Sequence, residues 1–259
     1  MKIGVSFHNT FPPTPAYIGR ILQISDGTKR DIRAVSDLTG IPQGESTGKA
    51  KPHLIYAMLM GLLEEDQSTL TPLGALVKAE DSNCSEELTQ WIMHRHLTSV
   101  TGADMWHYLY RELASRNNGI MTDEYYTSQL QNKFGPKANT RVVKSCYLNG
   151  LTAIDYLDDK DGIAIRRQHI QKDFLYLYAY ELLTEWENVF PDKVEITSDE
   201  MNLLHCDICF GLTPSDWFNV LELLASKSLL RLNRQLIPFT IIRTANASEM
   251  IPKLYSLLL

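Results

Sequence analysis

Residues 29–74 read KRDIRAVSDLTGIPQGESTGKAKPHLIYAMLMGLLEEDQSTLTPLG, in the order helix, turn, helix and hairpin that is typical of a winged helix. Thr28 can cap a first helix that ends at Gly40. The apolar residues of this helix fall on one stripe: Ile32, Val35 and Leu38. Residues 41–44 break the chain, and the pattern predicts a second helix from about Gly48.

The second helix is predicted to have two contrasting faces. One face is apolar and should point into a core: Leu54, Ile55, Met58, Leu59 and Leu62. The other face carries polar side chains one turn apart: Lys49, His53 and Tyr56. Residues 62–70 then form a short hairpin, and Thr71 with Pro72 begins the next helix. This order of elements makes double-stranded DNA the first partner to expect.

The same plan recurs twice downstream. Thr122 can cap a helix to Phe134, a second helix starts near Thr140, and residues 161–165 indicate a hairpin. Farther along, helices are predicted to start at Thr197 and Thr213, followed by a hairpin between residues 229–232 and residues 239–242. Aromatic residues recur at helical spacing in residues 85–98, 102–115 and 172–188, which is typical of packing between helices.

We therefore predict a mainly α fold, with tandem winged-helix-like modules whose short β-hairpins are joined by helical linkers. The expected domains are an N-terminal winged helix (1–80), a helical linker with a middle winged-helix-like domain (81–170), and a C-terminal helical, winged-helix-like domain (171–259).

Composition places the chain among soluble, cytoplasmic proteins. It has 259 residues, 44% of them hydrophobic and 22% charged, and no apolar run of about 20 residues that could span a bilayer. No secretory signal is visible at the N-terminus. Four cysteines are few for this length, which favours reduced, structural thiols. Cys206 and Cys209 form a lone C-x-x-C without the second ligand pair that a structural zinc needs.

The net charge of −6 excludes a chain coated in positive charge, but DNA contacts are local patches. Residues 1–63 carry 7 Lys and Arg against 4 Asp and Glu, and residues 130–170 carry 7 against 4. The acidic residues 64–66 at the tip of the first hairpin would be repelled by phosphate. The alternative interpretation of the basic middle segment is a solvated helix face with ordinary ion pairs.

Catalytic patterns are absent from the sequence, so we expect no enzyme activity, no cofactor and no metal. Residues 44–50 superficially resemble a phosphate-binding loop, but the first glycine is one residue too close to Gly48, and Ala50 replaces the magnesium-binding hydroxyl. His94 and His96 would lie about 200° apart on a helix and could not share an ion.

A set of short motifs resembles the bacterial domain-of-unknown-function family 4007. These motifs lie in residues 6–12 (SFHNTFP), 48–49, 61–63, 70–74 and 182–186. Asn9 departs from the acidic residue that is common in the opening motif. The resemblance implies an accessory protein of DNA-modification and defence gene clusters, often encoded near sulfotransfer enzymes. The family offers no established catalytic residues.

These patterns lead to one main hypothesis, a non-enzymatic DNA-binding accessory protein of a bacterial DNA-modification (phosphorothioation-like) or anti-phage defence system. The residues expected to face a major groove are Lys49, Lys51, His53 and Tyr56. The residues expected to contact phosphates are Lys137, Arg141 and Lys144, and Arg166 and Arg167 are also expected to bind DNA. The alternatives are a protein-interaction scaffold for a modifying enzyme or helicase, and a transcriptional regulator of its own gene cluster.

Overall fold

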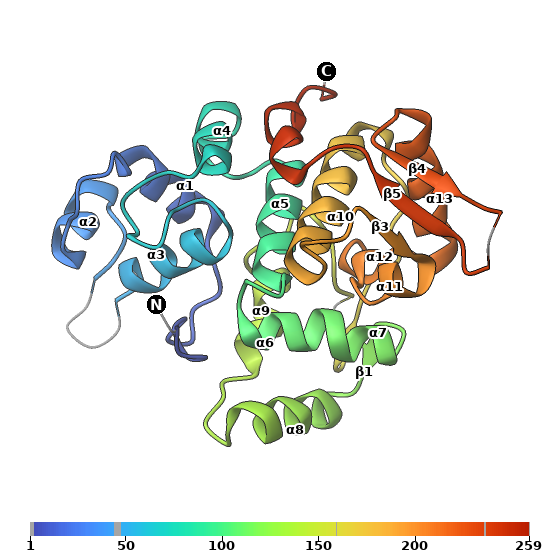
Figure 1. The fold of residues 1–259 in the computed structure, drawn as a ribbon. Helices are drawn as coiled ribbons and strands as arrows, with labels where there is room; N and C mark the ends of the chain where they lie inside the picture. The colour runs from blue at the N-terminus through green and yellow to red at the C-terminus, as the bar shows by residue number, and fades with distance from the viewer. Residues whose placement is uncertain (1–2, 44–47, 159, 236, 259) are drawn as a thin grey trace. The chain divides into compact units, whose positions relative to one another are not determined.

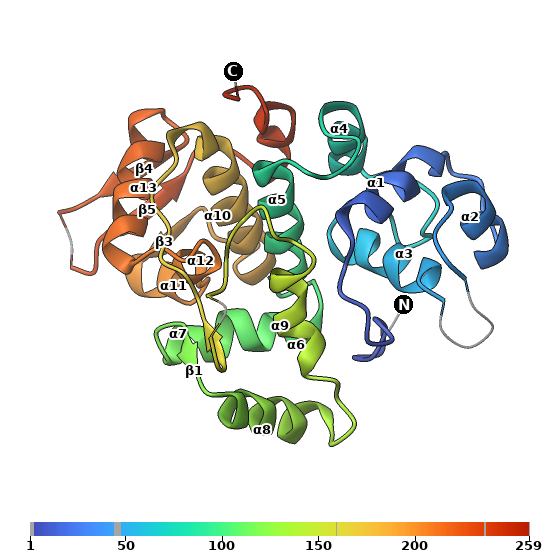
Figure 2. The ribbon, with the colours of Figure 1, turned by 180° about the vertical axis from the view of Figure 1, so that it is seen from behind.

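The computed structural model describes residues 3–43, 48–158, 160–235 and 237–258, and it is mainly α-helical as predicted (Figures 1 and 2). The chain divides into two compact units, Met1–Arg166 (unit 1) and Arg167–Leu259 (unit 2). The predicted domains 1–80 and 81–170 fall in unit 1 apart from residues 167–170, and the predicted domain 171–259 falls in unit 2. None of the described helices is long and apolar enough to cross a membrane.

Nearly all of the regular structure in unit 1 is helical. In chain order its elements are α1 (Pro15–Ile24), α2 (Ile32–Thr39), α3 (Ala50–Leu59), α4 (Pro72–Glu80), α5 (Glu87–Thr98), α6 (Asp104–His107), the π-helical η1 (Tyr108–Leu113), α7 (Ala114–Arg116), β1 (Ile120–Met121), α8 (Asp123–Phe134), α9 (Arg141–Leu148) and β2 (Ile163–Ala164).

Helix α2 ends where the sequence predicted but is capped by a different residue. Gly40 has a φ of 67°, a left-handed conformation that suits glycine and ends the helix. The N-cap is Asp31, whose carboxylate accepts a hydrogen bond from the backbone N–H of Ala34, rather than Thr28. Leu38 was predicted to point inward but is 59% exposed, because α2 packs on α1 and α3 through the side that carries Val35.

Helix α3 is buried on both of its predicted faces. Leu54 and Ile55 on the apolar face are buried as predicted, whereas Met58 and Leu59 are half-buried. Beyond α3, Leu63 and Leu70 form an antiparallel bridge, and the Thr71 hydroxyl accepts from the Gly74 N–H to cap α4. The predicted short hairpin and the helix that follows it are thus confirmed.

The middle segment combines two helices with a small antiparallel ladder. The Thr122 hydroxyl accepts from the Tyr125 N–H and caps α8, as predicted. Strand β2 pairs with β1, which precedes α8, through the register Ile120↔Ala164 and Met121↔Ile163. A bridge between Leu157 and Ile165 closes the turn predicted at residues 161–165.

Unit 2 places a three-stranded antiparallel sheet beside its helices. In chain order its elements are η2 (Lys172–Phe174), α10 (Leu175–Val189), β3 (Glu195–Thr197), α11 (Ser198–Asn202), α12 (Cys206–Cys209), α13 (Pro214–Ser226), β4 (Leu230–Asn233), β5 (Thr240–Arg243), η3 (Ala247–Glu249) and η4 (Ile251–Lys253).

The sheet of unit 2 has the order β3-β5-β4, with Ile241 opposite both Ile196 and Leu232. Capping boxes at Thr197 and Thr213 begin α11 and α13, which confirms both predicted helix starts. The core between α10, α13 and the sheet is formed by fully buried large side chains: Trp186, Trp217, Leu221 and Ile241.

Candidate nucleic-acid interface

A polar groove in unit 1 runs between α8 and α9. Its volume is about 640 Å³ on one side of Arg141 and about 510 Å³ on the other. Four residues line both sides: Gln131, Thr140, Arg141 and Ser145. Thr10, from the segment that precedes α1, lines the second side. The two cavities therefore form one continuous groove, which we call the α8–α9 groove.

The positive charge of this groove comes from α9. Arg141 is the first residue of the helix and is exposed, and Lys144 follows one turn later on the same wall. The Lys144 ammonium donates to the backbone carbonyl of Lys160 at 2.6 Å. A carbonyl has no net charge, so this hydrogen bond does not neutralise the positive charge of Lys144. Lys137 is exposed in the α8–α9 connection. The groove lining thus brings together two of the predicted phosphate-contacting residues, Arg141 and Lys144, and does not include Lys137.

The opposite wall of the groove is polar with one acidic residue, Asp123, at the start of α8. Burial raises the pKa of Tyr126 to about 12, and its hydrogen bond with Asp123 adds to this increase. The Thr127 and Thr140 hydroxyls lie 3.4 Å apart across the groove. Hydroxyl and amide groups beside two cations are the side chains that proteins use to hold phosphate oxygens.

Arg166 and Arg167 lie outside the groove lining. The Arg166 guanidinium pairs with Asp155 at 3.2 Å and with Asp158 at 2.9 Å, so its charge is balanced within unit 1. Arg167 belongs to unit 2, where its side chain donates to the carbonyl of Leu212 at 3.2 Å. These two residues do not extend the α8–α9 groove.

The residues predicted to face a major groove from α3 have different environments. Lys51 is exposed, and the Lys49 ammonium lies 5.3 Å from the centre of the Phe11 ring. His53 and Tyr56 are both 0% exposed, so the prediction that they face DNA is wrong. The reason is that the segment before α1 covers this side of α3.

Two hydrogen bonds fix that cover on α3. The Tyr56 hydroxyl donates to the carbonyl of Phe11 at 3.0 Å, and the backbone N–H of Thr14 donates to His53 Nε2 at 3.0 Å. Burial lowers the pKa of His53 to about 4, with the Lys49 charge acting in the same direction and a hydrogen bond to the Lys49 carbonyl opposing them. His53 is therefore a neutral structural side chain near pH 7.

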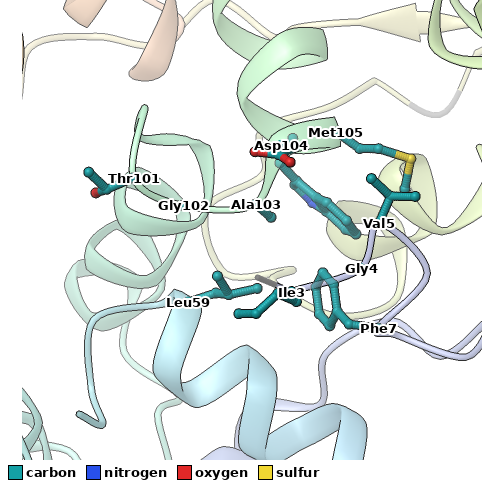
Figure 3. A pocket seen from close by; sticks show the side chains of 11 residues that line it. Ile3, Gly4, Val5, Phe7, Leu59, Thr101, Gly102, Ala103, Asp104 and Met105 are labelled. Atoms are coloured by element: carbon teal, nitrogen blue, oxygen red, sulfur yellow. The ribbon is translucent and has the colours of Figure 1, made fainter. Parts of the chain in front are cut away.

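The segment before α1 also forms one wall of a second cavity in unit 1, which we call the N-terminal pocket. Its volume is about 350 Å³. Figure 3 shows Leu59, Ile3 and Phe7 along one side and Asp104 and Met105 on the other. Phe7 is held by the buried rings of Tyr56 and Trp106, with centroid distances of 4.9 and 5.9 Å.

The backbone of this segment is unusual at two consecutive residues. Asn9 has a φ of 48° and Thr10 a φ of 84°, a region that residues other than glycine rarely occupy. The preceding residue, His8, is 1% exposed, and its Nδ1 accepts from the Thr10 N–H at 3.1 Å. Burial lowers the pKa of His8 to about 4. Strained backbone of this kind often occurs beside functional sites.

One histidine and two cysteines outside these cavities are structural. His94 is 0% exposed, and its Nδ1 lies 2.8 Å from the Tyr147 hydroxyl. Burial raises the pKa of Cys84 and Cys146 to about 12, which keeps both as unreactive thiols at neutral pH. Across residues 3–43, 48–158, 160–235 and 237–258, no group of three or more His, Cys, Asp or Glu side chains could hold a metal ion.

The sequence did not point to the polar lining of the α8–α9 groove or to the N-terminal pocket. Gln131 and Ser145 are ordinary polar residues on helices, and nothing in their spacing distinguishes them from a solvated face. Phe7 belongs to the opening motif that resembles family 4007, which singled it out without assigning a role. Asp104 lies 97 residues later in the chain, and only the fold brings it beside Phe7.

Two crystal structures of a protein named SspB have a similar fold. The first, described as magnesium ion-bound, is 14% identical with a TM-score of 0.71, and the match covers 99% of this chain and 89% of that chain. The second is 13% identical with a TM-score of 0.70 and the same coverage. At this identity the likeness concerns the fold alone. No protein-family model and no curated protein matches the chain.

Proposed function

We propose that this protein is a non-enzymatic DNA-binding accessory protein of a bacterial DNA-modification or anti-phage defence system, related to family 4007. The observation that carries the proposal is the α8–α9 groove, where Arg141 and Lys144 lie one turn apart on a wall rich in hydroxyl and amide groups. Such a surface can hold consecutive phosphates of a DNA backbone without reading its sequence.

The order of elements adds support from the fold. In unit 2, the order helix, strand, three helices and hairpin, with β3 paired to β5, is consistent with a winged helix. In unit 1, α1, α2 and α3 precede the bridge between Leu63 and Leu70 in a comparable order. We interpret both as winged-helix-like modules, of which the second is the more complete.

One SspB structure is described as magnesium ion-bound, and a magnesium ion in proteins is held mainly by carboxylates together with waters or substrate phosphates. The described part of this chain offers no cluster of three or more His, Cys, Asp or Glu side chains for such an ion. The proposal assigns no role to magnesium.

Titration of a labelled DNA duplex at rising salt concentrations tests the proposal. A protein that neutralises phosphates releases counterions, so the logarithm of its affinity falls linearly with the logarithm of the salt concentration. Arg141→Ala and Lys144→Ala should each weaken binding and reduce that slope by about 1. Arg116→Ala is the matched control, because Arg116 is 65% exposed in unit 1 but lies outside the groove lining. Equal binding by all three variants would contradict the proposal.

A second function, a scaffold that binds a DNA-modification or sulfotransfer enzyme of the same gene cluster, is favoured by the surface of unit 2. Helix α13 carries Asp216 and Glu222 and has no Lys or Arg, and unit 2 has 8 Lys and Arg against 12 Asp and Glu. Beside α13 lies a groove of about 450 Å³ lined by Phe218 and Phe239, with Ile237 fully exposed at the hairpin. An acidic surface with an apolar groove fits a partner that presents an apolar side chain on a basic surface.

Co-purification with the co-expressed neighbouring enzyme, after nuclease treatment, tests the scaffold. Ile237→Asp should abolish co-purification and leave DNA affinity unchanged. Arg141→Ala should weaken DNA binding and leave co-purification unchanged. Selection of one palindromic duplex sequence by the protein would instead support a transcriptional regulator.

A further inference from the structure

The N-terminal pocket has a chemistry distinct from that of the α8–α9 groove. Its volume of about 350 Å³ lies at the small end of the range for ligand pockets. Its apolar side chains come from Ile3, Phe7, Leu59 and Met105, polar groups make up a comparable share of the lining, and Asp104 contributes a carboxylate (Figure 3). A ligand that fits must be small, with an apolar face and polar edges of which one can donate a hydrogen bond.

Phe7 supplies an aromatic surface whose position is fixed. The ring is half-buried and packs edge-on against Tyr56, which is itself 0% exposed and bonded to the Phe11 carbonyl. An aromatic ring anchored in this way can stack a flat heterocycle without first being ordered. Stacking of this kind is how proteins bind unpaired bases, since every base has a π-face.

Asp104 is the polar residue of the pocket that would distinguish one ligand from another. It is the first residue of α6, is exposed, and lines the pocket. An ionised carboxylate only accepts hydrogen bonds, so it favours a ligand with an amino group. Cytosine presents such a group at N4, whereas thymine presents a carbonyl and a methyl group on the corresponding edge.

The same short segment reaches both the pocket and the α8–α9 groove. Phe7 lines the pocket, and Thr10 lines the groove together with Arg141. Three residues of chain span at most about 11 Å, so these two lining residues are close neighbours. A strand whose phosphate lies at Arg141 therefore has a base within reach of Phe7.

We propose that the N-terminal pocket binds one unstacked nucleobase that carries an exocyclic amino group, from a DNA strand whose phosphates lie in the α8–α9 groove. The proposal rests on the DNA-binding function proposed above and names the part of the strand that the pocket recognises. Phe7 stacks on the base, and Asp104 accepts a hydrogen bond from its amino group.

Fluorescence anisotropy with labelled oligo-dC and oligo-dT of equal length tests this inference on the full chain. Wild-type protein should bind oligo-dC about tenfold more tightly than oligo-dT, the discrimination expected of one specific base contact. Asp104→Asn should reduce the preference to less than about threefold, because an amide both donates and accepts. Asp37→Asn is the matched control, since Asp37 is an exposed carboxylate on α2, outside the pocket lining.

Phe7→Leu is a second variant that keeps an apolar side chain and removes the ring. It should weaken both oligonucleotides at least fivefold, with thermal unfolding measured alongside to confirm that the variant is folded. Equal affinity of the wild type for the two oligonucleotides, with Arg141→Ala still weakening both, would overturn the base pocket and leave the groove in place. A preference for oligo-dC that survives Asp104→Asn would also overturn it. Failure to bind any duplex or single strand in a salt-dependent way would overturn both proposals.

Discussion

The Nε2 atom of His53 accepts a hydrogen bond from the backbone N–H of Thr14 at 3.0 Å, which ties α3 to the segment that precedes α1. The Nδ1 atom of the same ring lies 2.7 Å from the carbonyl of Lys49. A neutral imidazole with its proton on Nδ1 satisfies both contacts, whereas a proton on Nε2 would break the bond to Thr14. The fold of this region therefore depends on His53 remaining neutral.

This dependence predicts that the protein loses stability as the pH falls. The pKa of His53 is about 4 in the folded chain against 6.5 for the unperturbed side chain. Between these two values the unfolded chain binds a proton that the folded chain does not, so the free energy of unfolding falls as the pH decreases from about 6.5 to about 4. The full shift corresponds to about 3 kcal/mol.

Urea unfolding across that pH range measures the effect. In His53→Gln, the free energy of unfolding should depend less steeply on pH. The difference in slope corresponds to at most one proton bound on unfolding. Some dependence should remain, because burial also lowers the pKa of His8 to about 4. His169→Gln is the control, since His169 is exposed in unit 2. An unchanged slope in His53→Gln would show that this histidine does not control acid unfolding.

Arg166 and Arg141 are both exposed, but we expect them to contribute differently to DNA affinity. The Arg166 guanidinium is already paired with Asp155 and Asp158, whereas Arg141 lines the α8–α9 groove. A paired charge gains little from a phosphate, so Arg166→Ala should change duplex affinity by less than about twofold, while Arg141→Ala weakens it and lowers the salt slope by about 1. The same salt titration measures both. Equal losses in the two variants would place Arg166 at the interface.

The sequence predicted those parts of the fold that depend on local chemistry. Helix starts at Thr71, Thr122, Thr197 and Thr213 follow from the hydrogen bond that a hydroxyl can offer to the first turn, and all four are confirmed. The end of α2 at Gly40 is also confirmed, because glycine readily adopts the left-handed conformation that ends a helix. These features need no knowledge of what packs nearby.

Features that depend on distant parts of the chain were not predictable in this way. Periodicity placed His53 and Tyr56 on a polar face of α3, but it could not show that residues 7–14 cover that face. Likewise, Leu38 has the spacing of a core residue yet is exposed, because a short helix such as α2 needs only part of its stripe for packing. At the candidate site, Arg141 and Lys144 were predicted from their charge, whereas the pocket formed by Phe7 and Asp104 required the tertiary fold.

The capping box at Thr213 predicts a measurable contribution to the stability of unit 2. The Thr213 hydroxyl accepts from the Asp216 N–H at 3.0 Å, and the Asp216 carboxylate bonds back to the Thr213 N–H. Thr213→Ala removes the first bond, together with the one that the Thr213 hydroxyl donates to the Asp216 carboxylate at 2.6 Å, and should lower the free energy of unfolding by about 1 kcal/mol. Ser215→Ala, at an exposed position in the first turn of α13, should change it by less than about 0.5 kcal/mol. Denaturant unfolding compares the two, and similar losses would mean that the capping box contributes nothing specific.

We expect a side chain at Gly74, in the first turn of α4, to clash with its surroundings. A Cβ atom at Gly74 would lie 1.9 Å from the carbonyl oxygen of Leu62, and Leu62 is itself fully buried. That oxygen accepts from the Thr71 N–H at 3.2 Å, so it cannot move without disturbing the start of α4. Gly74→Ala should therefore lower the free energy of unfolding by about 2 kcal/mol or more, although alanine favours helices over glycine. Gly4→Ala is the matched control, because no atom lies within 4 Å of the added Cβ there. If thermal unfolding showed Gly74→Ala to be as stable as Gly4→Ala, α4 would have to lie farther from Leu62 than the structure places it.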